Sequence, residues 1–239
     1  MLVTSATYRQ SSTVNPDLVA RDPENRLLAR GPRFRLSAEF IRDQALAVSG
    51  LLDQRIGGHS VSPYQPPGIW EEATFGKKTY VQDHGDALYR RGMYTFIKLT
   101  VPPPSMILFD ASNRDQCEVK RSKTNTPLQA LMMMNDPLVL EASRVLSEKL
   151  ADGKMAVADQ INAAFRRIVC RNPTEKESQV LQSYYMDQWQ QFKGGRLNAK
   201  NTITAGEHPS AEKKDINQVA ALMKVINAIY NLEETITKT

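Results

Sequence analysis

The chain has 239 residues, of which 41% are hydrophobic and 24% charged. This length suits one or two domains, and the composition is typical of a globular chain that buries a core without disulfide bonds. The formal net charge of +5 permits an acidic partner without requiring one. The longest uncharged stretch near the middle, residues 124–135, is too short and too polar to span a bilayer, so no transmembrane helix is expected.

The cysteines and histidines favour neither a disulfide framework nor a metal site. Cys117 and Cys170 lie far apart and form no C-x-x-C or C-x-x-C-H pattern, which excludes a self-contained zinc site. They could form one bridge, but two buried free thiols are the favoured interpretation, because free cysteine is among the most buried residue types. His59, His84 and His208 show no i, i+4 spacing, so no metal ligation is expected.

We expect a single domain over residues 1–239, built from two parts of different character. Residues 1–123 hold 17 Lys and Arg against 13 Asp and Glu, together with 9 of the 13 prolines, and are predicted to be irregular. Residues 124–239 contain few helix breakers and are predicted to be helical. The first ten residues lack the regions of a signal peptide and read as the end of a helix, which favours a C-terminal fragment of a larger protein.

Two helices are predicted in the first part from their capping residues. Asp22 followed by Pro23 is typical of a helix start, and this helix would continue to about Arg30. Ser37 would cap a second helix over residues 38–52, where apolar residues recur at spacings of three and four. Residues 59–79 combine prolines with aromatic residues and predict a loop.

Short strands are also predicted in the first part. Aromatic and β-branched residues concentrate in residues 89–99, which favours a strand. It would end at the three prolines 102–104, which predict an extended, polyproline-like path. Residues 117–121 could pair with it as a second strand.

Helix starts are clearest in the second part. Thr126-Pro127 and Asp136-Pro137 are successive cap and first-turn pairs, and the sequence from Thr174 onward fits a capping box. Helices are predicted over residues 128–134, 138–150, 157–170, from 174 onward, and 216–232, with a polar linker over 194–209. The predicted fold class is therefore mainly α, an irregular multi-helix domain with long Pro/Gly-rich loops and room for a small two-stranded β element.

The densest polar cluster in the sequence lies in residues 80–94. Asp83 or Asp86 could orient the imidazole of His84 for acid/base chemistry, and Arg90 and Arg91 could clamp a carboxylate, sulfate or phosphate. The favoured alternative is structural, because Asp and Gly around the histidine also suit a turn, with the arginines solvated or paired.

Two further groups could contribute to ligand binding. Arg121 and Asn125 precede a predicted helix start, which attracts anions, although a capping network is the favoured interpretation. Tyr64 and Trp70 stand among prolines and could form a platform for a sugar or a peptide, or equally pin the loop to the core.

Taken together, these motifs resemble the planctomycete PSD family, a domain of unknown function. The resemblance rests on residues 3–12, 22–28, 33–39, 41–43, 63–66, 80–91, 101–106, 124–131 and 231–234. It implies the C-terminal domain of large, often exported proteins that carry a cytochrome c module and an uncharacterised domain upstream. It implies no catalytic residues. The haem motif is absent, so no cofactor is assigned to this chain, and haem c would belong to the upstream module.

The leading functional hypothesis is a non-catalytic interaction or accessory domain of an exported, multi-domain bacterial protein with a cytochrome c link. Its expected partners are the upstream domains of the same polypeptide, a polysaccharide or another envelope protein. By resemblance, the expected location is the periplasm, cell envelope or extracellular space. The alternative is an enzyme or binding module for anionic polysaccharide that uses His84, Arg90, Arg91 and Arg121. Nucleic-acid binding is not expected, because the arginines are dispersed and no recognised motif accompanies them.

Overall fold

The computed structural model describes residues 1–112, 114–151, 155–210 and 215–238, and within these ranges the chain is mainly α-helical. The elements in chain order are α1 (Pro16–Arg21), β1 (Phe34–Arg35), α2 (Ala38–Ser49), α3 (Ile69–Ala73), α4 (Pro104–Leu108), α5 (Pro127–Asn135), α6 (Pro137–Ala151), α7 (Val157–Val169), α8 (Glu175–Lys193), α9 (Ala199–Thr202), α10 (Ile216–Tyr230), α11 (Glu233–Ile236) and β2 (Thr237–Lys238). The predicted fold class is confirmed.

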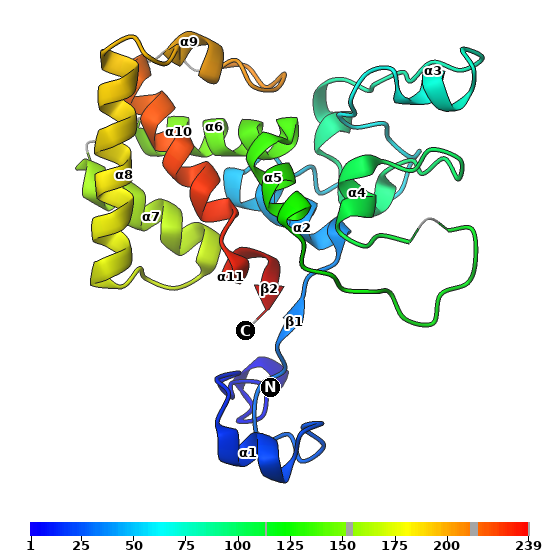
Figure 1. Ribbon diagram of the computed structural model, residues 1–239, viewed down its shortest axis with the longest axis vertical. Helices are drawn as coiled ribbons and strands as arrows, with labels where there is room; N and C mark the ends of the chain where they lie inside the picture. The colour runs from blue at the N-terminus through cyan, green and yellow to red at the C-terminus, as the bar shows by residue number, and fades with distance from the viewer. Residues whose placement is uncertain (113, 152–154, 211–214, 239) are drawn as a thin grey trace.

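Helix α10 forms the centre of the core. It is the most apolar of the long helices, and it packs against α6, α7 and α8, with further contacts to α5 and α9. Figure 1 shows these helices gathered on one side of the molecule, with the loops around α3 and α4 on the other. Leu222 and Ile226 of α10 and Phe165 of α7 are completely buried. Most of the hydrophobic stabilisation therefore comes from the second part of the chain.

The predicted helix starts of the second part are confirmed. The Thr174 hydroxyl accepts the Glu177 N–H, and the Glu177 carboxylate accepts the Thr174 N–H, as a capping box requires. The Asp136 side chain accepts the N–H groups of Leu138 and Val139 at the start of α6. These starts are predictable because the cap and the N–H groups that it satisfies are only a few residues apart.

The predicted helix over residues 22–30 is wrong. The helix lies earlier, at α1, where the Asn15 side chain accepts the Asp17 N–H. Asp22 follows the end of α1 and does not cap a new helix. Its carboxylate accepts the N–H groups of Arg26 and Leu27 and so closes a loop. Asn25, at a φ of 54°, has the left-handed backbone of a turn.

The predicted strands over residues 89–99 and 117–121 are also wrong. Residues Gly85–Tyr89 and Gly92–Tyr94 form two short 3₁₀ helices, and residues 117–121 form no strand. Sheet-like pairing in this region is limited to isolated bridges, such as Val61 with Thr95. The two-stranded sheet instead joins the ends of the chain: Phe34 pairs with Lys238 and Arg35 with Thr237 in antiparallel register.

Short helices interrupt three segments that were predicted to be irregular. Helix α3 lies in the aromatic loop, α9 lies in the polar linker, and α4 begins at Pro104 instead of continuing an extended path. A proline fits the first turn of a helix, because its missing N–H would have no partner there.

Both cysteines differ from the favoured expectation. Cys117 and Cys170 are free, as expected, but both are exposed, so the prediction that they are buried is wrong. Cys170 is the C-cap of α7, where a φ of 63° turns the chain away from the helix. Among the helices that the structure describes, none is long and apolar enough to cross a membrane.

An ion-pair hub joins the start of α8 to α11. The Arg171 guanidinium lies 2.6 Å from a carboxylate oxygen of Glu177 and 2.6 Å from one of Glu234. The hydrogen bond from Arg171 is the main cause that lowers the pKa of Glu177 from its ordinary 4.5 to about 2, against the opposing effect of burial. Protonation of Glu177 would therefore remove one of the two ion pairs of the hub.

We expect the stability of the protein to fall as the pH drops from about 4.5 to about 2, in part because Glu177 takes up a proton. Below its ordinary pKa the unfolded chain binds this proton first, so unfolding becomes more favourable. Urea unfolding at a series of pH values should show that the free energy of unfolding of Glu177→Gln falls less steeply below pH 4.5 than that of the unmodified chain. Glu175→Gln, in the same helical turn, is the control, and an equal flattening in it would contradict the assignment.

Candidate functional site

The predicted His84 site is a surface contact between two loops. His84 is exposed, and its Nδ1 lies 2.9 Å from both carboxylate oxygens of Glu207, which also accepts a hydrogen bond from Gln82. The Asp83 carboxylate accepts the Ser62 N–H, 2.6 Å away, and Asp86 is exposed in the 3₁₀ helix Gly85–Tyr89. The partner of His84 is therefore a glutamate from the distant linker instead of either neighbouring aspartate.

Two of the three predicted arginines have partners of their own. Arg90 is buried, with its guanidinium 4.1 Å from the centre of the Tyr94 ring and a 2.6 Å hydrogen bond to the Gly57 carbonyl. Arg121 forms a 2.8 Å ion pair with Glu39 of α2. Arg91 is half-buried beside α2. Asn125 is exposed just before α5. Arg90 and Arg121 are thus held by structural contacts of their own, in different parts of the fold.

The two loop aromatics hold their loop to the rest of the protein. The Trp70 ring lies edge-on to Tyr80 at 5.2 Å, and the Lys98 ammonium lies 4.4 Å from the centre of the Trp70 ring. The Tyr64 hydroxyl donates to Glu141 and accepts the Glu207 N–H. Tyr64 and His84 thus meet at the same linker residue, which the sequence spacing of 123 residues between His84 and Glu207 conceals.

A buried carboxylate that the sequence did not single out organises this region. Glu141 of α6 is fully buried and accepts hydrogen bonds from the hydroxyls of Tyr64 and Tyr89 and from the His208 N–H. The distances are 3.0, 2.9 and 2.6 Å. Burial is the main cause that raises the pKa of both tyrosines, and the negative charge of Glu141 raises it further, so both hydroxyls remain donors.

Arg144, one turn after Glu141, fixes the linker over this carboxylate. Its guanidinium donates to the carbonyls of Ala205 and His208 and to the carboxylate of Glu148. Burying the Arg144 guanidinium costs several kcal/mol of desolvation, and the hydrogen bonds to these three acceptors offset that cost. The signal in the sequence is the run Glu141, Arg144 and Glu148, in which opposite charges stand three and four residues apart.

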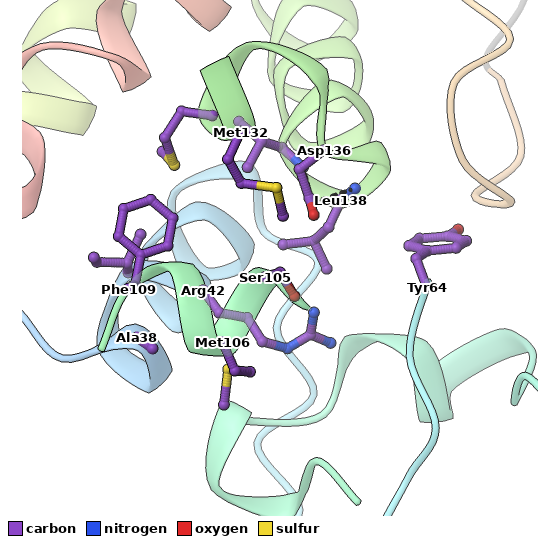
Figure 2. Close-up of a pocket in the computed structure, with 12 residues that line it drawn as sticks. Ala38, Arg42, Tyr64, Ser105, Met106, Phe109, Met132, Asp136 and Leu138 are labelled. Carbon is purple, nitrogen blue, oxygen red and sulfur yellow. Dashed lines mark hydrogen bonds between the residues drawn. The ribbon is translucent and has the colours of Figure 1, made fainter. Parts of the chain in front are cut away.

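A small cavity lies where α2, α4 and α5 meet the start of α6 (Figure 2). Arg42 and Asp136 face it from opposite sides, with Ser105 between them, and Tyr64 stands at one end. The remaining wall is apolar and is formed by Ala38, Ile41, Met106, Phe109, Met132, Met133, Leu138 and Val139. None of the residues around the predicted His84 cluster contributes to this cavity apart from Tyr64.

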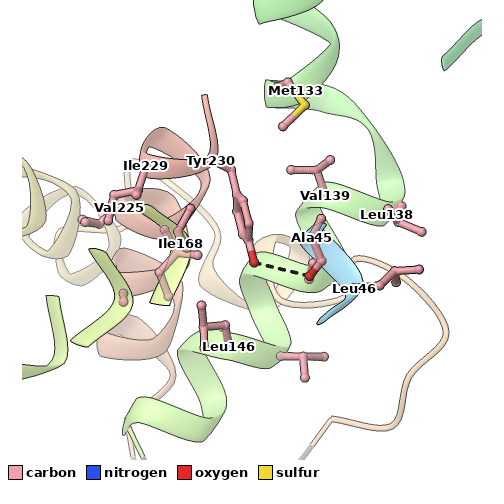
Figure 3. Close-up of a cluster of buried hydrophobic side chains, with 14 of the residues drawn as sticks. Ala45, Leu46, Met133, Leu138, Val139, Leu146, Ile168, Val225, Ile229 and Tyr230 are labelled. Carbon is pink, nitrogen blue, oxygen red and sulfur yellow. Dashed lines mark hydrogen bonds between the residues drawn. The ribbon is translucent and has the colours of Figure 1, made fainter. Parts of the chain in front are cut away.

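A groove of about 800 Å³ runs between α2, α7 and β2. Its apolar wall is formed by Leu36, Phe40, Ala47, Val48, Leu52, Ile168 and Val169, and Arg91, Arg167 and Lys238 contribute positive charge. Its floor reaches the hydrophobic core through Ile168, and within that core the Tyr230 hydroxyl donates to the Ala45 carbonyl of α2 (Figure 3).

The N-terminal arm, residues 1–33, borders this groove through Tyr8. Figure 1 shows the arm projecting from the helical body, to which β1 connects it. No hydrophobic side chain of the arm is buried, and Leu2, Val3, Leu27 and Leu28 are each more than half exposed. The arm therefore presents apolar surface that the described chain does not cover.

Comparison with known proteins identifies the family. A family model named PSD1, described as a protein of unknown function (DUF1553), matches residues 1–185. The chain belongs to the PSD1 family. No curated protein and no solved structure matches it.

The matched part of this PSD1 chain does not contain the whole core. The match ends within α8, whereas α10, against which α6 and α8 pack, lies beyond residue 185. The PSD1 segment does contain the arm, α2, Arg42, Asp136 and Glu141. Glu207 and His208, which complete the Glu141 network, come from outside it. For the described residues, no group of three or more His, Cys, Asp or Glu is placed to hold a metal ion.

Proposed function

We propose that this chain is a non-catalytic interaction domain of an exported, multi-domain bacterial protein. The observation that carries the proposal is the open groove whose floor reaches the core, with Phe40 64% exposed at its edge and the apolar arm beside it. Contiguous exposed apolar surface on a soluble domain marks an interaction site. His84 and Asp83, which could have supported catalysis, are engaged in contacts between loops.

The charge of the groove defines the chemistry of its partner. Arg167 and Lys238 are exposed at its edge, and its two carboxylates already have partners: Asp43 accepts the Gly92 N–H and Glu234 pairs with Arg171. The complementary partner is an apolar segment with flanking acidic residues. The family resemblance supports the upstream domains of the same polypeptide as the source of this segment. Among them would be a planctomycete-type cytochrome c module, which would carry the haem. The whole protein would lie in the periplasm, the cell envelope or the extracellular space.

Replacing Phe40 with aspartate is expected to weaken binding of the separately produced upstream domains by about tenfold or more, because it puts a carboxylate on the apolar face. Binding is measured by calorimetry. Stability should barely change, because the ring is exposed. Phe75→Asp is the matched control, since Phe75 is 92% exposed and does not line the groove.

Two results would overturn this proposal. One is equal binding by the Phe40→Asp and Phe75→Asp variants and the unmodified chain. The other is turnover of a sulfated or carboxylated polysaccharide by the isolated chain that is abolished in His84→Ala. The second result would establish the alternative function instead.

A further inference from the structure

The cavity bounded by α2, α4, α5 and the start of α6 is small but has room for a ligand. The space open to the centre of a water-sized sphere is about 40 Å³. A single water needs roughly 10–15 Å³ by this measure, so about three water-sized groups fit. The cavity therefore suits a molecule of a few heavy atoms, not a cofactor or an oligosaccharide.

Arg42 brings an incompletely satisfied positive charge to this cavity. One terminal nitrogen, Nη2, donates to the Leu88 carbonyl at 2.6 Å, whereas the buried Nε has no hydrogen-bond partner. Across the described ranges, no carboxylate lies in ion-pair range of the Arg42 guanidinium, in contrast to Arg121 or Arg144. Burial lowers the pKa of Arg42, which reflects the cost of keeping this charge away from water. A bound carboxylate would offset that cost.

Asp136 brings the opposite charge from the other side. The hydrogen bonds described for its carboxylate, from the N–H groups of Leu138 and Val139, both go to Oδ1. Burial raises the pKa of Asp136, while the charge of Arg42 acts in the opposite direction. Figure 2 shows both side chains pointing into the cavity without a hydrogen bond between them. The two charges are thus separated by the cavity instead of neutralising each other in a direct pair.

The walls between the charges are apolar and adaptable. Met106 and Met132 flank the cavity together with Phe109, and the unbranched methionine side chain adjusts to irregular shapes. Ser105 places a hydroxyl beside the guanidinium. A complementary ligand would have a carboxylate and a hydrogen-bond-donating cation a few bonds apart, with at most a short apolar side chain.

We infer that this cavity binds a short α-amino acid of the size of glycine or alanine. The ligand carboxylate would accept hydrogen bonds from the Arg42 guanidinium and the Ser105 hydroxyl. The ligand ammonium would donate to Asp136, and the alanine methyl group would contact the methionine wall. This inference does not depend on the groove or on its partner.

The test is calorimetric titration of the full chain with glycine and with alanine, compared with acetate and with methylamine. Glycine or alanine is expected to bind saturably and at least about tenfold more tightly than either half-ligand, because only the amino acid satisfies both charges. Arg42→Gln and Asp136→Asn should each weaken binding about tenfold or more. Arg121→Gln is the matched control and should bind like the unmodified chain.

A third variant keeps both charges, so it tests the inference even if Arg42→Gln or Asp136→Asn fails to fold. Ser105→Leu should occupy the cavity and abolish binding while the circular dichroism spectrum stays unchanged. Absence of saturable binding to the unmodified chain would overturn the inference. So would acetate binding as tightly as glycine, or undiminished binding by Ser105→Leu.

Discussion

Replacing Glu141 with leucine is expected to lower the free energy of unfolding by about 3–5 kcal/mol, the range for breaking a buried charge network by removing one partner. The carboxylate is fully buried and accepts three hydrogen bonds, from Tyr64, Tyr89 and the His208 N–H. Leucine fills a similar volume but leaves all three donors without an acceptor. It also removes the carboxylate oxygen that lies 3.8 Å from Arg144. Urea unfolding followed by circular dichroism measures the loss.

One further variant separates the charge of Glu141 from its hydrogen bonds, and a second serves as a control. Glu141→Gln keeps one acceptor oxygen and should lose less stability than Glu141→Leu. Glu24→Leu is the surface control, because the Glu24 side chain is exposed and its 3.9 Å contact with Arg26 is exposed as well. A loss in Glu141→Leu no larger than that in Glu24→Leu would show that the network contributes nothing to stability.

The network also explains how the irregular first part stays ordered. Tyr64 and Tyr89 lie in a part of the chain whose regular structure is limited to short helices and isolated bridges. Their hydroxyls converge on one carboxylate of α6, and Arg144 fixes the linker over the same point. A buried polar cluster of this kind specifies one arrangement of loops against a helical body, which apolar packing alone does less well.

Helices of the second part could be predicted from the sequence because their signals are local. At Thr174 the capping side chain and the N–H group that it satisfies lie three residues apart, and the apolar face of α7 repeats every three or four residues. Such patterns need no knowledge of the rest of the fold. The boundaries of α5, α6 and α10 accordingly lie within two residues of the predicted ones.

In the first part, the helix predicted from Ser37 is confirmed as α2, but the predicted strands are wrong because the structure there depends on distant residues. Residues 89–99 have strand-like composition, but Gly92 lies against the Glu39 backbone, where an added Cβ would come within 2.9 Å, and its N–H donates to Asp43. This contact with α2 holds the segment in a 3₁₀ turn. The strands β1 and β2 are two residues long and some 200 residues apart, too short for any alternation to appear.

Sequence reasoning identified some residues of the candidate site but not the residues that they contact. His84 and Tyr64 stand out in the sequence as a polar and an aromatic residue among turn-forming ones, and the structure joins them through Glu207. Arg42 and Asp136 did not stand out, because one looks like an ordinary helix-surface arginine and the other like a helix cap. Only the packing of α2 against α6 turns them toward the same cavity.

Replacing Gly206 with alanine is expected to lower the free energy of unfolding by about 2–4 kcal/mol and to loosen the linker over α6. Gly206 has a φ of 79°, which alone strains any other residue by about 1 kcal/mol or more. An added Cβ would also lie 2.0 Å from the Glu141 carboxyl carbon, in a site whose oxygens already have three donors. Neither group can move without breaking hydrogen bonds, so overpacking adds a further cost.

Gly195→Ala is the matched control for Gly206→Ala, because Gly195 has nearly the same φ, 73°, and open space where the Cβ would stand. It should cost only the backbone strain, about 1 kcal/mol. Urea unfolding gives the two losses, and hydrogen exchange of the amides in residues 203–208 shows where the loss acts. Faster exchange is expected there in Gly206→Ala alone, because displacement of the loop removes the His208 N–H from Glu141 and Glu207 from His84. Equal losses of unfolding free energy in the two variants would mean that the loop moves aside without cost, and that Glu141 does not hold it in place.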